Sequence, residues 1–196
     1  MPFLASRRAG DDVTESPRSD AFPTRLARRV GYALVLLPAA VATVGAVAAG
    51  RSDRAAAWWA RAAEQGLAAQ TSSRRPGAGR LLAHALLCVP LGLLALVPLG
   101  VEILFVLRGV LYPLVDQGPY DHSWGGPTMG GAWAVHFIVA LPFAAAGLGA
   151  LWQLSRLHGR LAGGMWGRKV GPGPVLATVV SCAVAVVLVI AWTHQL

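Results

Sequence analysis

Four long apolar runs, almost free of charge, constrain this chain of 196 residues more than any other feature. We place them at residues 30–50, 81–107, 131–154 and 174–194. The second run holds a single charged residue, Glu102, and the others hold none. About 20 apolar residues match the roughly 30 Å hydrocarbon core of a bilayer, and backbone groups in lipid must bond internally. Each run is therefore expected to be a transmembrane helix.

Composition supports the same class. Hydrophobic residues make up 55% of the chain and charged residues 13%, against about 25% charged in a typical soluble domain. We predict an all-α integral membrane protein of the plasma membrane, with about four transmembrane helices in one membrane domain over residues 29–196. Residues 1–28 are polar and basic without periodicity and are expected to be disordered.

Two of the runs admit other interpretations. The first could be a secretory signal sequence, because residues 46–48, Ala-Val-Ala, resemble a cleavage site. The second continues in apolar sequence to residue 115 and contains Pro90 and Pro98, so a split at Pro98 would give five spans. We favour one span in each case.

Two amphipathic stretches follow similar apolar segments. Residues 54–69 and 152–166 combine Trp with Arg, which is typical of interfacial helices. They come after VLLPAA at residues 35–40 and VALPFA at residues 139–144. A parallel repeat of this kind predicts that the first and third spans run in the same direction.

The distribution of Lys and Arg indicates how the chain is oriented in the membrane, but the loops and the N-terminal tail point to opposite orientations. Six lie before the first span, six in residues 51–80, one in the next loop and four after the third span. The positive-inside rule places the two basic loops in the cytoplasm and residues 109–130 outside. The N-terminus would then be outside, against its own basic residues, unless a re-entrant hairpin at Pro38 keeps it inside.

The loop between the second and third spans is polar, aromatic and rich in proline. Its candidate residues for binding a ligand or partner are Asp116, Tyr120, Asp121, His122 and Trp124. The alternative is a loop with a structural role only, which its Pro and Gly residues order and Trp124 anchors at the membrane interface. Asp121, His122 and Ser123 are consecutive, which prevents a catalytic relay, so we expect no enzymatic activity.

Two ionisable residues lie inside the spans. Glu102 and His136 are each about 8–9 Å from the loop by helical rise, on consecutive antiparallel spans. We predict an intramembrane polar pair between them, either as a structural hydrogen bond or as a titrating site. Carboxylate and imidazole groups of Asp116, Asp121, His122 and His136 could also ligate a divalent metal, but their spacing matches no metal signature, and we predict no metal site and no cofactor. Cys88 is interpreted as a packing residue and His84 as interfacial.

Residues 80–167 resemble a family of actinobacterial sensor domains, membrane modules usually found N-terminal to histidine kinases. WGGP at residues 124–127 followed by GAWAVH at 131–136 carries the most specific part of the likeness. The resemblance implies an input module, but it supplies no ligand and no site residues. No kinase segment follows the last span, so we expect a module that acts without its own kinase domain.

The sequence therefore favours a non-enzymatic, sensor-like or accessory signalling module. Its expected partners are the lipid bilayer and a membrane signalling partner or a second copy of the chain, and not nucleic acid. The net charge of +8 is attributed to loops facing anionic headgroups. The alternative is a small transporter or channel subunit, or a structural membrane protein. A transporter should carry several polar groups at mid-membrane, and the span centres hold almost none.

Overall fold

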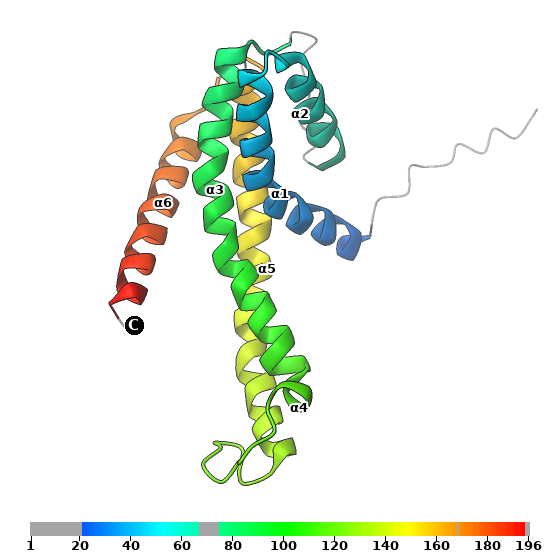
Figure 1. Ribbon diagram of the computed structural model, residues 1–196, viewed down its shortest axis with the longest axis vertical. Coiled ribbons are helices and arrows are strands. Elements are labelled where there is room, and N and C mark those ends of the chain that lie inside the picture. Colours follow the sequence, from blue (N-terminus) through cyan, green and yellow to red (C-terminus); the bar gives the residue numbers. More distant parts are fainter. Residues whose placement is uncertain (1–20, 67–74, 168, 195–196) are drawn as a thin grey trace, which may run out of the picture.

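The computed structural model describes residues 21–66, 75–167 and 169–194, and all regular secondary structure in these ranges is helical (Figure 1). Its helices are α1 (Phe22–Ala48), α2 (Ser52–Gly66), α3 (Ala78–Leu104), α4 (Tyr112–Val115), α5 (Met129–Met165) and α6 (Pro172–Thr193). A π-helical turn, η1 (Phe105–Val110), continues α3. Figure 1 shows α3 and α5 as a long antiparallel hairpin, with α1 and α2 beside one end and the 116–128 loop at the other.

Three helices are long and apolar enough to cross a membrane. They are Phe22–Ala48, Ala78–Val110 and Met129–Met165, and the apolar segment Pro172–Val184 of α6 is shorter. Large apolar side chains face outward along them, including Leu86 at 67% exposure and Phe143 at 63%. Apolar surface of this extent suits lipid rather than water. The fold is that of a multi-pass membrane protein in contact with the bilayer.

The continuity of the helices corrects several expectations. α1 begins at Phe22, so residues 22–28 of the tail predicted to be disordered are helical, and residues 1–20 lie outside the described chain. α1 is bent (Figure 1) but continues through Pro38 as one helix, so the re-entrant hairpin is wrong. α3 likewise contains Pro90 and Pro98 within one helix, which excludes the five-span interpretation. Helices packed in apolar surroundings tolerate proline because neighbouring groups compensate for the lost hydrogen bond.

The second predicted interfacial helix is also wrong, because residues 152–166 are the end of α5 and its C-cap. No proline follows Pro142 within α5, and the helix ends just before Gly167, whose φ of 83° lies in the left-handed region that ends helices. The first predicted interfacial helix is separate: α2 covers Ser52–Gly66, and residues 67–69 fall outside the described chain.

α1 and α5 run in the same direction, as the internal similarity predicts. The Arg29 guanidinium lies 4.9 Å above the Trp152 ring, and farther along both helices Tyr32 contacts His158. Small residues let the helices approach: Ala33, Ala40 and Ala85 are fully buried.

One side chain ties α2 to this core. The Trp59 indole is buried, and its Nε1 donates a hydrogen bond of 2.8 Å to Thr43 Oγ1 on α1. The Thr43 hydroxyl in turn donates to the Ala39 carbonyl at 2.7 Å. Trp58, the residue before Trp59, is 37% exposed and meets the Trp59 ring edge to face, with ring centroids 4.8 Å apart. α2 therefore packs one indole, Trp59, into the helix bundle and leaves the other, Trp58, partly exposed on the surface.

The closest approach of α1 and α3 predicts a stability effect. A Cβ added at Gly92 would lie 2.7 Å from both the Cβ and the backbone nitrogen of Leu37. Because backbone cannot yield easily, Gly92→Ala should lower the free energy of unfolding by about 1–3 kcal/mol. Gly100→Ala, in the same helix with open space around it, is the matched control and should be neutral or stabilising. Unfolding in mixed detergent, followed by circular dichroism, measures both, and equal effects would contradict the packing.

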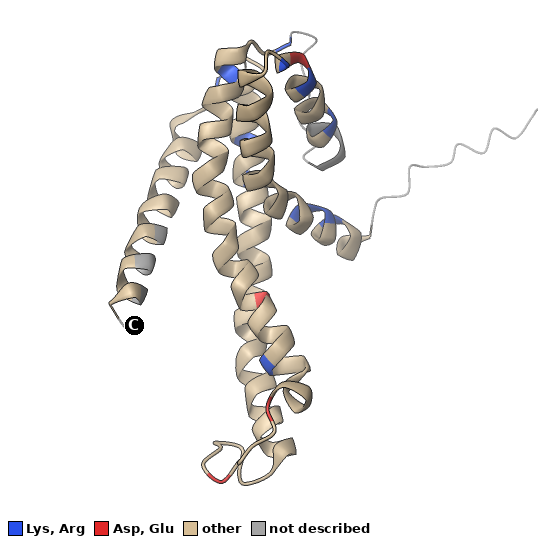
Figure 2. Cartoon of the chain, in the orientation of Figure 1, with Lys and Arg blue, Asp and Glu red and all other residues tan. Residues whose placement is uncertain are grey.

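Figure 2 shows Lys and Arg gathered around α2 and the adjoining ends of α3 and α5, and also on the first turns of α1. The 116–128 loop lies at the far end of the α3–α5 hairpin (Figure 1). In a Cys182→Ser background, a membrane-impermeant maleimide added to intact cells should label Ser123→Cys in the loop and leave Ser52→Cys at the start of α2 unlabelled. The opposite labelling would reverse the orientation.

Candidate functional sites

Local hydrogen bonds order the 116–128 loop. The Asp116 carboxylate accepts from the Gly118 backbone N–H at 3.1 Å, and the Tyr120 hydroxyl donates to the Asp116 carbonyl at 2.8 Å. The Ser123 hydroxyl accepts from the Gly125 N–H at 3.3 Å. Asp and Ser make such turns because their short side chains reach the backbone two residues on. The loop is therefore a folded element.

The loop is also fastened to the helices that it connects. Gly125 packs against the backbone of Gly131, and the Thr128 hydroxyl caps α5 by accepting from the Gly131 N–H at 3.2 Å. Across the hairpin, Trp133 Nε1 donates to the Gly109 carbonyl in η1 at 2.6 Å. These contacts hold the loop over the end of the α3–α5 pair.

A cavity of about 760 Å³ lies under this loop, between the end of α3 with η1 and the first half of α5. We call it the loop pocket. Its deeper walls are apolar, with Leu104, Val139 and Phe143 among them. Its mouth is polar and aromatic, formed by Arg108, Asp116, Tyr120, His122, Ser123 and Trp124. The pocket thus changes from apolar to polar along its depth.

Most of the loop residues singled out from the sequence line this pocket. Asp116, Tyr120, His122 and Trp124 do so, while Asp121 is exposed and is not part of the lining. Trp124 is 93% exposed, which leaves its indole available at the mouth. The structure therefore brings four of the five predicted residues to one cavity. Their role in binding stays a prediction.

His136 also lines the pocket, stacked on Tyr112 with ring centroids 4.6 Å apart. Its Nδ1 lies 2.8 Å from the Ala132 carbonyl, one turn earlier in α5. Burial, together with the nearby Asp116 carboxylate, raises the pKa of the Tyr112 phenol above its ordinary value. Tyr112 is therefore a neutral phenol beside the pocket at physiological pH.

The predicted contact between Glu102 and His136 is wrong. Glu102 faces the α5 backbone at Gly147 and Leu148, eleven and twelve residues beyond His136. The helix register is the cause. Phe105 pairs with Phe137, at 5.6 Å between ring centroids, so in the antiparallel register Glu102 lies opposite Ala140 rather than His136, and its side chain reaches farther along α5 to Gly147. Among the described residues, Glu102 Oε1 is buried without a hydrogen-bond partner.

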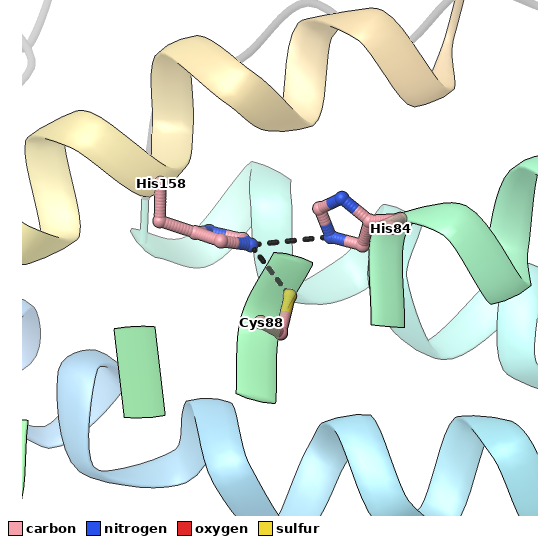
Figure 3. Close-up of side chains that lie close together, drawn as sticks. All are labelled: His84, Cys88 and His158. Carbon is pink, nitrogen blue, oxygen red and sulfur yellow. Dashed lines mark hydrogen bonds between the residues drawn. The ribbon is translucent and has the colours of Figure 1, made fainter. Parts of the chain in front are cut away.

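A second polar site lies at the other end of the bundle (Figure 3). His84 and Cys88, one turn apart on α3, meet His158 from α5, and we call these three residues the His–Cys cluster. His158 Nε2 lies 3.1 Å from His84 Nε2 and 3.2 Å from Cys88 Sγ. All three donor atoms are within 4.8 Å of one another, and exposure of the residues is 0–4%. Of the described residues, only these three form such a group of possible metal ligands.

Two aromatic residues surround the cluster. The Tyr32 hydroxyl of α1 lies 3.0 Å from His158 Nδ1, on the opposite side of the ring from the other two cluster residues. The Trp59 indole of α2 meets the His84 ring edge to face at 4.6 Å and the His158 ring at 5.6 Å. Four helices thus contribute to this site, which is closed to solvent.

Sequence reasoning missed the cluster. It interpreted Cys88 as packing and His84 as interfacial, and the structure buries both in one polar group. The available signal was His84 four residues before Cys88 on an apolar helix, a spacing that places both side chains on one face. The third member lies 74 residues from His84, and nothing in the spacing relates them.

No known protein family, curated protein or solved structure matches the chain. The resemblance to bacterial sensor domains therefore stays a prediction.

The packing of the loop on α5 can be tested with one methyl group. A Cβ at Gly125 would collide with the Gly131 backbone, so Gly125→Ala should open the loop and expose the half-buried Tyr120. Cleavage by chymotrypsin after Tyr120, in protein embedded in nanodiscs, should accelerate about fivefold or more. Gly130→Ala, which has open space, should cleave at the wild-type rate. Equal rates for the two variants would show that the loop does not depend on this contact.

Proposed function

We propose that this protein is a non-enzymatic membrane sensor or accessory signalling module that binds a small amphiphilic ligand in the loop pocket. The observation that carries the proposal is the pocket itself, apolar between the helices and polar at its mouth. Small-molecule sites generally have this build: a mostly apolar cavity with a few placed polar groups. The resemblance to sensor modules supports the same class. In this proposal α6 is a fourth span, and the protein resides in the plasma membrane.

The pocket is well placed to change helix packing. It is bounded by η1 on one side and by α5 on the other, and isolated π-turns are frequent at functional sites. A ligand that fits one packing of these two helices better than another shifts the population between them. The basic end of the bundle would pass that shift to a signalling partner or to a second copy of the chain.

The chemistry of the mouth suggests an anionic head group. Arg108 lines the pocket, and no described carboxylate forms a salt bridge with it; the salt bridge between Arg75 and Asp53 lies at the other end of the bundle. Arg108 is thus positioned to pair with a carboxylate, while Tyr120 and Ser123 offer hydroxyl groups nearby.

The alternative, a small transporter or channel subunit, rests on Glu102. Its buried, unpartnered carboxylate oxygen inside a candidate span is the kind of group that marks an ion path. One acidic residue does not define a path, whereas the loop pocket gathers six polar or aromatic side chains at its mouth. Ligand binding is therefore the better supported function.

The pocket can be tested with 11-bromoundecanoate, which has a carboxylate head and a brominated tail that quenches tryptophan on contact. In nanodiscs it should quench the fluorescence of Trp124 until the site is saturated. The Trp124 component is the fluorescence of the wild-type protein minus that of Trp124→Phe. Ala140→Phe, which fills the pocket, should abolish this component, and Arg108→Gln should weaken it about tenfold. Ala134→Phe, exposed on the same helix, is the control and should bind normally. Linear quenching that is identical in every variant would mean partition into lipid only and would contradict the proposal.

A further inference from the structure

We propose that His84, Cys88 and His158 form a binding site for a single Cu(I) ion. This site is distinct from the loop pocket and does not rest on the function proposed there. It lies inside the end of the bundle that carries α2, where α1, α2, α3 and α5 meet. The inference depends on five properties of the cluster: its proton count, its geometry, its charge, the number and softness of its ligands, and its surroundings.

Hydrogen bonding alone does not account for the contacts. An imidazole nitrogen has either one N–H or one lone pair, so His158 Nε2 can make one good hydrogen bond within the ring plane. It nevertheless lies 3.1 Å from His84 Nε2 and 3.2 Å from Cys88 Sγ (Figure 3). The two contacts therefore share either one proton or one lone pair of Nε2, so at most one of them is a well-formed hydrogen bond. A metal ion satisfies all three donor atoms at once.

The geometry needs little adjustment to hold an ion. In a trigonal site with metal–nitrogen bonds of about 2.0 Å and a metal–sulfur bond of about 2.3 Å, the ligand atoms lie about 3.5–3.7 Å apart. The observed separations of 3.1 and 3.2 Å must therefore open by about 0.5 Å, and the separation of the His84 and Cys88 ligand atoms, which lies within 4.8 Å, must come to about 3.7 Å. Side-chain rotation can supply both changes. His84 and Cys88 come from adjacent turns of one helix, so they form a fixed pair that His158 completes.

Charge selects a monovalent ion. The described residues within the cluster and its surround include one group that can become an anion on metal binding, the Cys88 thiol, and the site is 0–4% exposed. Cu(I) with one thiolate and two neutral imidazoles has no net charge, whereas Zn(II) would leave a buried positive charge. An uncompensated charge in such surroundings costs several kcal/mol.

Ligand number and softness favour the same ion. Zinc in proteins is almost always four-coordinate, with a water as the fourth ligand where the protein supplies three. The cluster supplies three ligands and is closed to solvent, which disfavours such a water. A soft thiolate with two imidazoles suits Cu(I), which accepts three ligands. Binding then follows a balanced step: Cu(I) replaces the thiol proton of Cys88, and one H⁺ is released.

The surroundings orient the ligands as metal sites require. The Tyr32 oxygen can accept the Nδ1 proton of His158 at 3.0 Å, which leaves the Nε2 lone pair facing the other two ligands. The Trp59 indole covers both imidazoles and excludes water. Tyr32 is thus a positioning residue that acts through His158.

The test uses the full chain in nanodiscs, loaded anaerobically with Cu(I) against the chelator bathocuproine disulfonate. We expect one Cu(I) per chain, and an X-ray absorption spectrum with two nitrogen ligands and one sulfur ligand. Cys88→Ser should weaken binding by at least about 100-fold, and Tyr32→Phe by about 10- to 100-fold. The matched control is Cys182→Ser, which removes the other cysteine and should bind as the wild type does.

Three results would overturn the proposal. They are a copper site without sulfur, equal loss of binding in Cys182→Ser, and displacement of the ion by equimolar Zn(II). If Cys88→Ser fails to fold, the wild-type spectrum and the affinity of Tyr32→Phe decide the matter. The pocket-filling variant Ala140→Phe should retain full Cu(I) binding, which separates this site from the function proposed for the loop pocket.

Discussion

The antiparallel register of α3 against α5 determines where the polar groups of these two helices meet. In lipid the helices must satisfy their own backbones, so only side chains and small-residue contacts can fix how one helix slides along the next. Here the Trp133 indole bonds to the Gly109 carbonyl at one end, and His158 meets His84 and Cys88 at the other. A shift of one turn, about 5.4 Å, would break both ends at once.

The same register explains why the polar sites lie at the two ends of the hairpin. Between them lie the Phe105–Phe137 ring contact, Glu102 against Gly147, and buried small or apolar residues such as Leu91, Ala95, Ala144 and Leu151. α1 joins only one end, where the absence of a side chain at Gly92 lets Leu37 approach and brings Tyr32 beside His158. The loop end lacks this third helix, which is why a cavity of about 760 Å³ persists there between two helices.

Hydropathy and loop composition predicted a large part of this arrangement. The apolar runs identified the long helices because the bilayer sets their length. The cluster of Asp116, Tyr120, His122 and Trp124 in sequence marked the loop that covers the pocket. The ends of the helices were less predictable, because Trp152 to Trp166 is amphipathic in composition yet simply continues α5.

What sequence could not supply was the pairing between helices. Glu102 and His136 were matched by depth, counted from the ends of the apolar runs. The true reference is the Phe105–Phe137 contact, which sets Glu102 opposite Ala140, and from there the Glu102 side chain reaches Gly147. The His–Cys cluster has the same origin, since α5 extends past residue 154 and thereby carries His158 to α3. A helix that ended at residue 154 would leave His84 and Cys88 without their third partner. The length of α5, rather than any local motif, is therefore what turns two isolated polar residues on an apolar helix into a site with three converging ligand atoms.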